Sequence, residues 1–183
     1  MNRERAYEEL TVRLETVNLI KHSIAVEAIM KKLAEHLQQD IHLWGLTGLL
    51  HDIDMDKTGG DMEKHGMVGA EILEGLNVDP TIIYAVRAHN PKLGYPRRRK
   101  IDKAIFCSDP LSGLIIACAL ILPDKKLEGV DTDFVLRKFT EKSFAKGADR
   151  EQIRTCSEIG LALEDFIGIA LKAMKEIHIK LGL

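Results

Sequence analysis

Cysteines and aromatic residues are scarce in this sequence, and it has no long apolar run. The three cysteines are an odd number without paired spacing among 183 residues, so we expect buried free thiols in a reducing compartment rather than disulfides. The longest apolar stretch, residues 111–122, is too short to cross a bilayer. The first residues alternate in charge and contain no apolar segment, unlike a secretory signal. These absences predict a cytoplasmic protein that has no membrane partner.

Neither sign of charge dominates the chain. Lys and Arg number 26 and Asp and Glu 28, which gives a net charge of −2 at pH 7 and argues against general binding to polyanions. The chain is 45% hydrophobic and 30% charged with only 5% aromatic residues, a composition typical of a helical protein. Without a repeat or a linker, residues 1–183 predict a single domain, with a core of about residues 18–122 and a C-terminal helical extension of about residues 130–183.

Apolar residues recur at spacings of three and four along most of the chain, which predicts helices. No segment alternates strictly enough for a strand, so we expect an all-α fold, a helical bundle. The predicted helices cover residues 3–16, 19–37, 41–51, 66–76, 80–89, 101–107, 111–122, 131–140, 149–157 and 160–180. Residues 52–61 and 90–100 are predicted loops. Asp109 followed by Pro110 has the pattern of an N-cap that starts a new helix after a break.

Two glycines lie inside the apolar helix predicted at residues 41–51. Gly45 and Gly48 each cost about 1 kcal/mol relative to alanine in a helix interior. Close approach of a neighbouring helix explains such residues, and His51 follows Gly48 by three positions on the same face. We therefore expect this helix to be central, with His51 at its C-terminal end.

The dipeptide His51-Asp52 ends this helix and starts an acidic loop that also contains Asp54, Asp56 and Asp61. With seven His and thirteen Asp residues in the chain, such a pair is expected about half the time by chance. The acids lie where the helix dipole already places negative charge, an arrangement that a bound cation makes favourable. A solvated acidic loop is the alternative, so the pair matters only if other ligand-type residues join it.

Four further ligand-type residues lie at or near predicted helix ends: His22, His65, His89 and Asp109. Each also has an ordinary explanation, such as a half-buried ring, a cation at a helix C-terminus or an N-cap. Six such residues together favour a metal site between helices over separate coincidences. The remaining histidines have no carboxylate companion and are expected to be structural or exposed: His36, His42 and His178.

The ligand types narrow the choice of metal. Imidazole and carboxylate without thiolate suit Fe, Mn, Co, Ni or Zn as the divalent ion. Either His51 and Asp52 share one ion near the helix end, or Asp52 bridges two ions while His51 binds one. Such a site lowers the pKa of a bound water to about 7 and supplies hydroxide to a phosphorus centre.

The order His22, then His51-Asp52, then Asp109 resembles that of the HD-domain superfamily of metal-dependent phosphohydrolases. The resemblance implies an all-helical bundle that holds the metal between helices. It also implies a reaction in which a metal-activated water attacks a phosphomonoester or a phosphodiester. In layout the chain is similar to the symmetrical dinucleoside tetraphosphate hydrolases of the same ligand order.

The segments around His65 and His89 resemble the subset of this superfamily that has two further histidines, and the similarity covers about residues 20–115. The resemblance implies two metal sites that share Asp52 as a bridge. The first ion would be bound by His22, His51, Asp52 and Asp109, and the second by Asp52, His65 and His89.

Two departures from the family pattern concern the catalytic helpers. Family members often carry a Lys or Glu three residues after the Asp, and this chain has Met55 there. We expect Asp56 to orient the water and Lys57 to contact phosphate instead. Gly94-Tyr95-Pro96 echoes the cyclic-di-nucleotide phosphodiesterase branch, but the histidine spacing and the neighbouring residues differ, so we interpret it as coincidence.

Residues 97–100, Arg-Arg-Arg-Lys, form either a solvated basic turn or a phosphate clamp, since they lie between His89 and Asp109. Interleaved aromatic residues are missing, so nucleic acid is not an expected partner. We expect a phosphomonoesterase, phosphodiesterase or dinucleotide hydrolase acting on a nucleotide or another small phosphate ester. The alternatives are a regulatory module that retains metal and binds a nucleotide without turnover, and a plain helical interaction protein. The oligomeric state and the role of the C-terminal third stay open.

Overall fold

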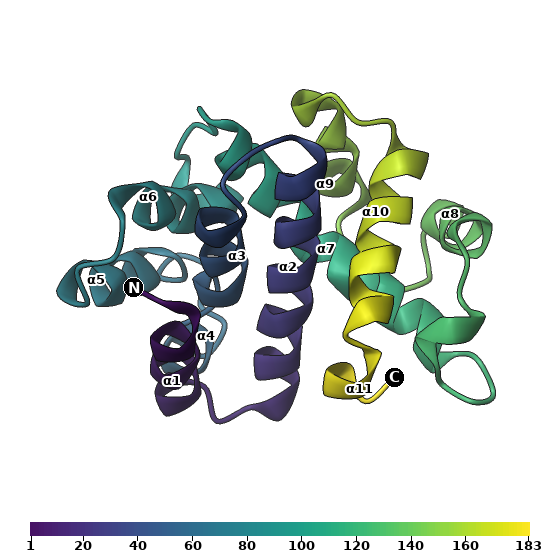
Figure 1. The fold of residues 1–183 in the computed structure, drawn as a ribbon, viewed down its shortest axis with the longest axis horizontal. Coiled ribbons are helices and arrows are strands. Elements are labelled where there is room, and N and C mark those ends of the chain that lie inside the picture. Colours follow the sequence, from purple (N-terminus) through teal and green to yellow (C-terminus); the bar gives the residue numbers. More distant parts are fainter.

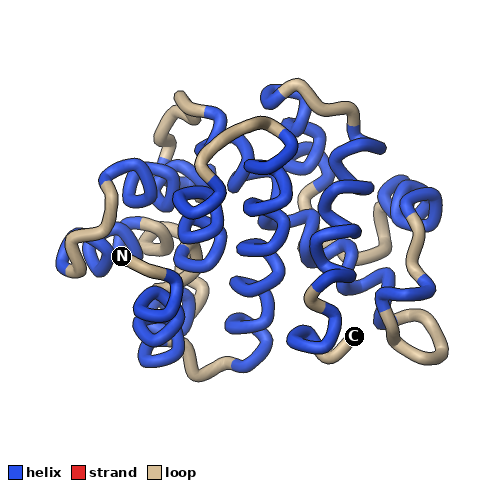
Figure 2. The backbone as a smooth tube through the Cα atoms, in the orientation of Figure 1, coloured by secondary structure: helices blue, strands red, loops and turns tan.

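The computed structural model describes all 183 residues, and its elements are helices joined by turns without any strand (Figure 1; Figure 2). The all-α prediction is therefore confirmed. The α-helices are α1 (Arg3–Arg13), α2 (Val17–His36), α3 (Ile41–Leu50), α4 (Met55–Thr58), α5 (Met67–Gly75), α6 (Pro80–His89), α7 (Lys100–Leu120), α8 (Thr132–Thr140), α9 (Arg150–Arg154), α10 (Leu163–Glu176) and α11 (His178–Leu181). Short 3-10 turns are η1 (Pro91–Leu93), η2 (Leu127–Gly129) and η3 (Thr155–Ile159).

Helix α2 lies between α3 on one side and α10 on the other (Figure 1). The contact between α2 and α3 is close because Gly48 has no side chain. A Cβ atom added at Gly48 would lie 2.7 Å from the backbone oxygen of Val26 on α2. At Gly45 the same atom would meet only the flexible side chain of Lys31. The expected approach of a neighbouring helix is confirmed, and it brings the C-terminal end of α3 against α2.

The predicted break at residues 108–110 is wrong, because α7 runs without interruption from Lys100 to Leu120. Asp109 is an interior residue of this helix rather than its N-cap. Pro110 has no amide hydrogen to donate to the carbonyl of Phe106, one turn earlier. The side chain of Gln152 replaces that donor, with 2.7 Å between Nε2 and the Phe106 oxygen. A residue 46 positions away from Phe106 thus satisfies the carbonyl that the proline leaves free.

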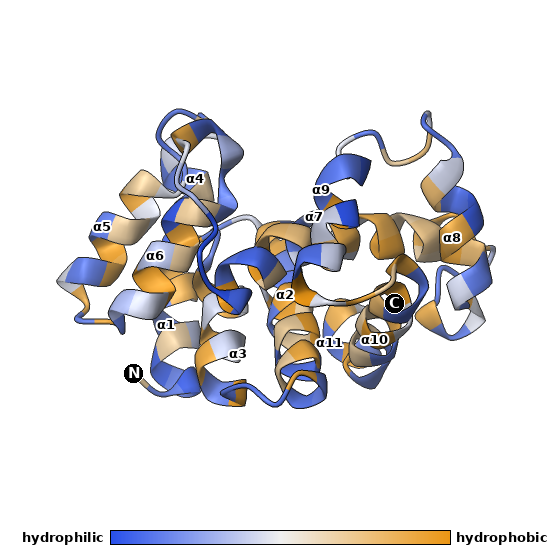
Figure 3. Cartoon of the chain, turned by 90° about the horizontal axis from the view of Figure 1, so that it is seen from above, coloured by the Kyte–Doolittle hydropathy of each residue, from blue (hydrophilic) through white to orange (hydrophobic).

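Helix α7 has 21 residues and is long and apolar enough to cross a membrane by length and composition. Its most apolar window is 67% buried within the protein, which is the pattern of a core helix. The sequence interpretation divided this helix at Pro110 and so underestimated its length. The central helices α2, α7 and α10 carry much of the apolar surface that forms the core (orange in Figure 3).

Three other expectations differ in detail. The predicted loop at residues 52–61 contains the short helix α4. The predicted helix 149–157 divides into α9 and η3, and the predicted helix 160–180 begins at Leu163 and is interrupted at Ile177. One buried apolar cluster includes residues from α1 through α11, so the C-terminal helices share the core of the N-terminal ones.

Candidate metal centre

Five segments of the chain bring the six ligand-type residues into one cluster. His22 lies on α2, His51 and Asp52 follow α3, and His65 lies in the turn before α5. His89 is the last residue of α6, and Asp109 lies in the middle of α7. The carboxylate of Asp52 lies at the centre, with one of its oxygens 3.3 to 3.6 Å from Nε2 of each histidine.

The cluster divides into two groups that share Asp52. In each group the candidate ligand atoms lie within 4.8 Å of one another: His22, His51 and Asp52 form one, and Asp52, His65 and His89 form the other. Asp109 belongs beside the first group, because its Oδ1 lies 3.1 Å from His22 Nε2 and 3.8 Å from His51 Nε2. The structure thus places all six residues where two neighbouring ions would share one carboxylate.

Two of the four histidine rings donate a hydrogen bond from Nδ1 to a backbone carbonyl. His51 Nδ1 lies 2.8 Å from the oxygen of Gly48, and His89 Nδ1 lies 2.5 Å from the oxygen of Val86. A carbonyl oxygen only accepts hydrogen bonds, so the proton of each neutral ring is on Nδ1. The helix turn that precedes each ring therefore sets its tautomer.

The other two rings also carry their proton on Nδ1. His65 Nδ1 donates to Asp54 Oδ1 at 2.8 Å. Ser112 Oγ donates its only proton to the carbonyl of Asp109 at 2.9 Å, so it accepts from His22 Nδ1 at 3.0 Å. All four Nε2 atoms are consequently left with a free lone pair in the neutral state, and all four face the cluster.

These lone pairs point at one another. The Nε2 atoms of His22 and His51 are 3.2 Å apart, and those of His65 and His89 are 2.9 Å apart. Two lone pairs at this distance repel, and a proton or a metal cation between them removes the repulsion. Four neutral imidazoles and two carboxylates form a donor set that fits divalent transition metals, so the residues present match the metal that the sequence implies.

The carboxylates and histidines of the cluster shift one another's pKa values. Burial lowers the pKa of His51, but the charges of Asp52 and Asp109 outweigh it and raise that pKa to about 9. Burial likewise opposes the effect of Asp52 and Asp54 on His65, whose pKa is raised to about 10. Burial acts to raise the pKa values of Asp52 and Asp109, and the histidines overcome it and hold both well below the ordinary range. The carboxylates therefore stay charged and attract cations into a buried space.

Asp54 is a residue that the sequence interpretation missed, since it was grouped with the exposed acids of the loop. Its side chain is fully buried, and Oδ1 accepts the bond from His65. Its Oδ2 accepts hydrogen bonds from the amides of Gly66 at 2.8 Å and Gly69 at 2.7 Å. Burial opposes ionisation, but these donors lower the pKa of Asp54. The two glycines that follow His65 were the available signal, because a Cβ at Gly69 would lie 3.2 Å from Asp54 Cγ.

The structure directs Asp56 away from its expected role. Its Oδ2 accepts from the amides of Glu15 and Thr16 at 2.7 and 2.9 Å, and its Oδ1 accepts from the Thr16 hydroxyl. Both oxygens are therefore occupied at the junction between α1 and α2, where the carboxylate covers the start of α2. Lys57 is exposed on α4 and forms no hydrogen bond or ion pair, so its contact with phosphate stays a prediction.

Two arginines of the basic run have structural partners. Arg97 stacks on Phe106 with its guanidinium carbon 3.9 Å from the ring centre, and it donates to Glu158. Arg99 pairs with Asp102 in the first turn of α7. These contacts argue against a phosphate clamp at these two side chains.

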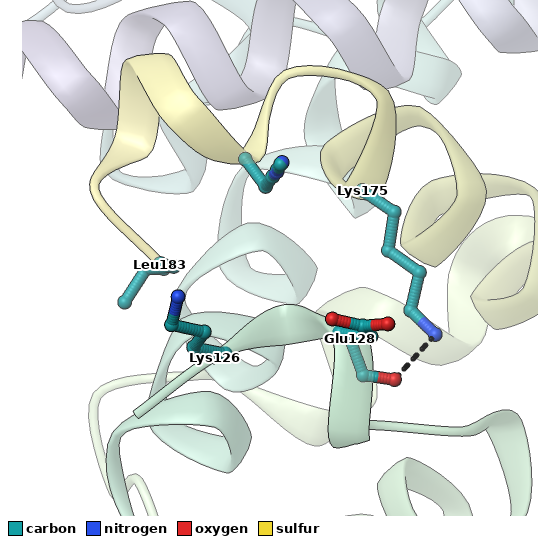
Figure 4. Close-up of a pocket in the computed structure, with 5 residues that line it drawn as sticks. Lys126, Glu128, Lys175 and Leu183 are labelled. Carbon is teal, nitrogen blue, oxygen red and sulfur yellow. Dashed lines mark hydrogen bonds between the residues drawn. The ribbon is translucent and has the colours of Figure 1, made fainter. Parts of the chain in front are cut away.

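A cavity of about 410 Å³ lies in the C-terminal third of the chain, away from the cluster (Figure 4). It is lined by Lys126, Glu128, Lys175, His178 and Leu183, and Lys175 Nζ donates to the backbone oxygen of Glu128 at 3.3 Å. The lining contains both signs of charge and none of the residues of the cluster. His178 therefore does not join the metal centre, and neither does His42, whose Nε2 lies 3.1 Å from the carbonyl of Met1.

One side of the cluster is open. The side chains of His22 and Asp109 are 19% and 29% exposed, whereas those of His65 and His89 are 4% and 2% exposed. A cavity of about 350 Å³ adjoins the open side and includes His22 and Asp109 in its lining. A ligand that reaches the cluster therefore approaches the first group, and the second group lies behind it.

The profile of the HD domain family matches residues 19–109, a range that holds all six residues of the cluster. This chain belongs to the HD domain family. The assignment agrees with the resemblance carried by the order of the histidines and aspartates, and members of the family are metal-dependent phosphohydrolases.

Similar proteins extend the comparison beyond the HD domain. Ribonuclease Y of Lawsonia intracellularis is 30% identical over 139 residues, which cover 74% of this chain and 26% of that protein. Ribonuclease Y of Clostridium perfringens is 30% identical over 141 residues, 73% of this chain and 26% of that protein. An uncharacterized protein of Methanocaldococcus jannaschii is 32% identical over 136 residues, 68% of this chain and 77% of that protein. This chain thus spans about a quarter of the length of the Ribonuclease Y relatives, and no solved structure matches it.

Proposed function

We propose that this chain is a metal-dependent phosphohydrolase that acts on a nucleotide or another small phosphate ester. The observation that carries the proposal is the convergence of four Nε2 lone pairs and two carboxylates on one buried centre. Each imidazole is already oriented by a partner on Nδ1, so binding an ion requires little rearrangement. Membership in the HD domain family supports the class of reaction.

The residues that would hold metal follow from the two groups. His22, His51, Asp52 and Asp109 would hold the ion on the open side, and Asp52, His65 and His89 would hold one behind it. Fe, Mn, Co, Ni and Zn all suit these ligands. A divalent ion there supplies Lewis acidity and lowers the pKa of a coordinated water to about 7.

The protein itself contributes orientation, charge and exclusion of water. Gly48, Val86, Ser112 and Asp54 hold the rings through Nδ1, which keeps each Nε2 directed at the centre. Burial of the second group keeps bulk water from that side. The exposed edge formed by His22 and Asp109 admits the phosphate from the adjoining cavity.

The substrate range includes RNA as well as small nucleotides. Two relatives named Ribonuclease Y support this, so the expectation that nucleic acid is not a partner lacks support. Aromatic side chains also accompany the basic run in space: Arg98 lies over the ring of Tyr84, 5.6 Å from its centre, and Tyr95 packs edge-on against Tyr84. The sequence interpretation missed this arrangement because Tyr84 lies on another helix.

The test is a metal analysis followed by a substrate screen. The purified protein is loaded with Mn²⁺, Co²⁺, Ni²⁺ or Fe²⁺ and assayed against bis(4-nitrophenyl) phosphate, mononucleotides, dinucleotides and a short single-stranded RNA. We expect metal-dependent release of product, and loss of more than about 100-fold in Asp52→Ala, because this change removes the shared ligand. The matched control is Asp61→Asn, an exposed acid of the same loop that pairs with Lys64. Activity that survives Asp52→Ala would refute the proposal.

A regulatory module without turnover is the second candidate. Met55 favours it, because this side chain packs against the core at the position where family members often carry a Lys or Glu. In that case nucleotides would stabilise the metal-loaded protein against heat while none of the substrates was hydrolysed. Turnover that depends on the metal of the cluster would exclude this candidate.

A further inference from the structure

The cavity beside the metal centre is completed by residues outside the range that matches the HD domain family. His22 and Asp109 form its inner end. The remaining lining is Pro110 and Gly113 of α7 and three residues between α8 and α9, namely Ala145, Gly147 and Ala148. Its volume of about 350 Å³ lies at the lower end of the range of small-molecule sites. This cavity is called the Gly113 cavity below.

Two residues that line the Gly113 cavity, Gly113 and Gly147, have no side chain, and both are exposed. Gly113 is an interior residue of α7, where glycine is less favourable than alanine because of its backbone entropy. A Cβ atom added at Gly113 would meet nothing within 4 Å, so no neighbouring element requires a glycine there. The same holds for Gly147, in the segment between α8 and α9. Neither glycine has a positive φ, so the backbone conformation does not require glycine at either position, and each leaves open space along the cavity.

The outer wall of the cavity is held in place by one side chain. Arg150 donates to backbone oxygens of the segment between α8 and α9, at 2.8 Å for Ala145, 2.6 Å for Ala148 and 2.6 Å for Phe144. Ala145 has a φ of 45°, a left-handed conformation that is uncommon for a residue with a side chain. A strained wall that is fixed by several hydrogen bonds is typical of a ligand-binding segment.

Two lysines that form no ion pair lie in a hollow next to the Gly113 cavity. Lys142 and Lys146 are exposed, form no ion pair, and line an adjoining hollow that shares Ala148 with the Gly113 cavity. Of the two acids of that hollow, Asp149 caps α9, and Glu151 is exposed and lies 3.7 Å from Arg154. The two lysines therefore bring positive charge to the side of the cavity that Ala148 lines, and this charge favours an anionic ligand.

We propose that the Gly113 cavity binds the nucleoside part of the substrate, and that the absence of side chains at Gly113 and Gly147 sets the size of the group it accepts. The proposal rests on the proposed function in placing the phosphate at the His22–Asp109 side of the centre. A nucleoside that extends from that phosphate enters the cavity between Pro110 and the Ala145–Ala148 wall. Residues outside the family core thereby determine which phosphate esters fit.

The experiment fills the cavity without touching the metal ligands. Gly113→Leu is compared with Gly75→Leu, since Gly75 also has nothing within 4 Å of an added Cβ but lies at the end of α5, outside the cavity. Both variants should unfold at the wild-type temperature or above. Binding of AMP and of inorganic phosphate to the Mn²⁺-loaded proteins is measured by calorimetry. Gly113→Leu should weaken AMP binding by about tenfold or more, which is about 1.4 kcal/mol, and leave phosphate binding unchanged.

Each outcome decides. Wild-type affinity for AMP in Gly113→Leu would overturn the proposal, and so would equal losses for AMP and phosphate or a wild-type protein that binds no AMP. Selective loss of AMP binding in a protein that hydrolyses nothing would support the cavity while refuting the hydrolase. If Gly113→Leu hydrolysed both AMP and 4-nitrophenyl phosphate, and the ratio of the two rates equalled that of the wild type, the hydrolase would be supported and the role of the cavity refuted. If Gly113→Leu does not fold, Gly147→Val in the segment between α8 and α9 is judged by the same results.

Discussion

The orientation of each imidazole is determined by a single atom on its Nδ1 side. Two of these atoms are backbone carbonyls, one is the hydroxyl of Ser112, and one is the carboxylate of Asp54. Asp54 differs from the other three partners because it is charged and buried. It also accepts hydrogen bonds from two backbone amides, those of Gly66 and Gly69. It therefore couples the position of His65 to the turn that starts α5.

We expect Asp54→Asn to weaken metal binding by about 10–100-fold, as is usual when the partner of a metal-binding histidine is changed. The substituted amide has the size of the carboxylate, but its NH2 group must face a hydrogen-bond donor. One buried donor is thus left without a partner, which costs about 1–3 kcal/mol of unfolding free energy. Calorimetric titration with Mn²⁺ and urea unfolding measure the two effects.

The control for this change is Asp61→Asn, because Asp61 lies on the surface of the same loop and pairs only with Lys64 and the amide of Glu63. Asp61→Asn should leave the Mn²⁺ affinity and the unfolding free energy within error of the wild type. Metal affinity that is equal in Asp54→Asn and the wild type would contradict the role assigned to Asp54.

At the scale of secondary-structure elements, α7 depends on a contact from outside the helix. Pro110 has no amide hydrogen, so the helix lacks the hydrogen bond that would reach the carbonyl of Phe106. The side chain of Gln152 donates to that carbonyl instead. The contact keeps Asp109 on a regular helix, one residue before the proline. The position of a candidate metal ligand is thus linked to α9.

The link is measured by a double-mutant cycle. We expect Gln152→Ala to lower the unfolding free energy by about 1–3 kcal/mol, because it leaves a buried carbonyl unsatisfied. In the Pro110→Ala background the restored amide bonds that carbonyl, so the same change should cost much less. Urea unfolding of the four proteins gives the coupling energy. Equal costs of Gln152→Ala in both backgrounds would show that the Gln152 bond does not replace the missing amide.

The junction of α1 and α2 provides a pH-dependent contact. The backbone amide and hydroxyl of Thr16, with the amide of Glu15, lower the pKa of Asp56 from its ordinary value of 3.8. A lowered folded-state pKa means that the contact stabilises the fold above the unfolded pKa. That stability is lost as the pH falls through the folded-state value.

We therefore expect Asp56→Asn to be less stable than the wild type at about pH 6, and the difference to shrink as the pH falls to about 3. Urea unfolding of both proteins at several pH values provides the measurement. A difference that persists at the lowest pH would show that the charge of Asp56 is not responsible. Hydrolysis by Asp56→Asn should stay near the wild-type rate, since both carboxylate oxygens are used at this junction.

On the scale of the whole molecule, the metal centre joins segments from most of the first 110 residues. Its candidate ligands come from α2, the end of α3, the turn before α5, the end of α6 and the middle of α7. Unfolding separates all of them, so a metal ion bound at the centre stabilises the folded state through mass action.

We expect saturation with Mn²⁺ to raise the unfolding temperature. At a metal concentration of about 100 times Kd the gain is about 2.7 kcal/mol, and for a chain of this size each kcal/mol raises Tm by about 2–4 °C. A chelator should reverse the rise, and Asp52→Ala should show little of it. Differential scanning calorimetry with and without metal tests this, and an equal rise in Asp52→Ala would place the stabilising ion elsewhere.

The candidate ligand residues could be named from the chain alone, because they are ligand-type residues at or near predicted helix ends and their order resembles that of the HD-domain superfamily. The all-α fold followed from the periodicity of the apolar residues. The acids that follow His51 could not be told apart in this way. Asp54 and Asp56 are two residues apart, yet one is buried against His65 and the other covers the start of α2. Their directions depend on the turns of the backbone after α3, which local sequence does not specify.

Local residue patterns predicted most of the helices, the candidate histidine and aspartate ligands, and the type of metal that they suit, because periodicity and donor chemistry are properties of the sequence. Contacts between separate segments decided the rest: the unbroken α7, the tautomers of His22 and His65, and the wall of the Gly113 cavity. These features depend on which backbone and side-chain groups meet in the folded protein, and on the space left between them. Every residue offers a backbone carbonyl, so only the packed chain determines which one a given ring or guanidinium reaches.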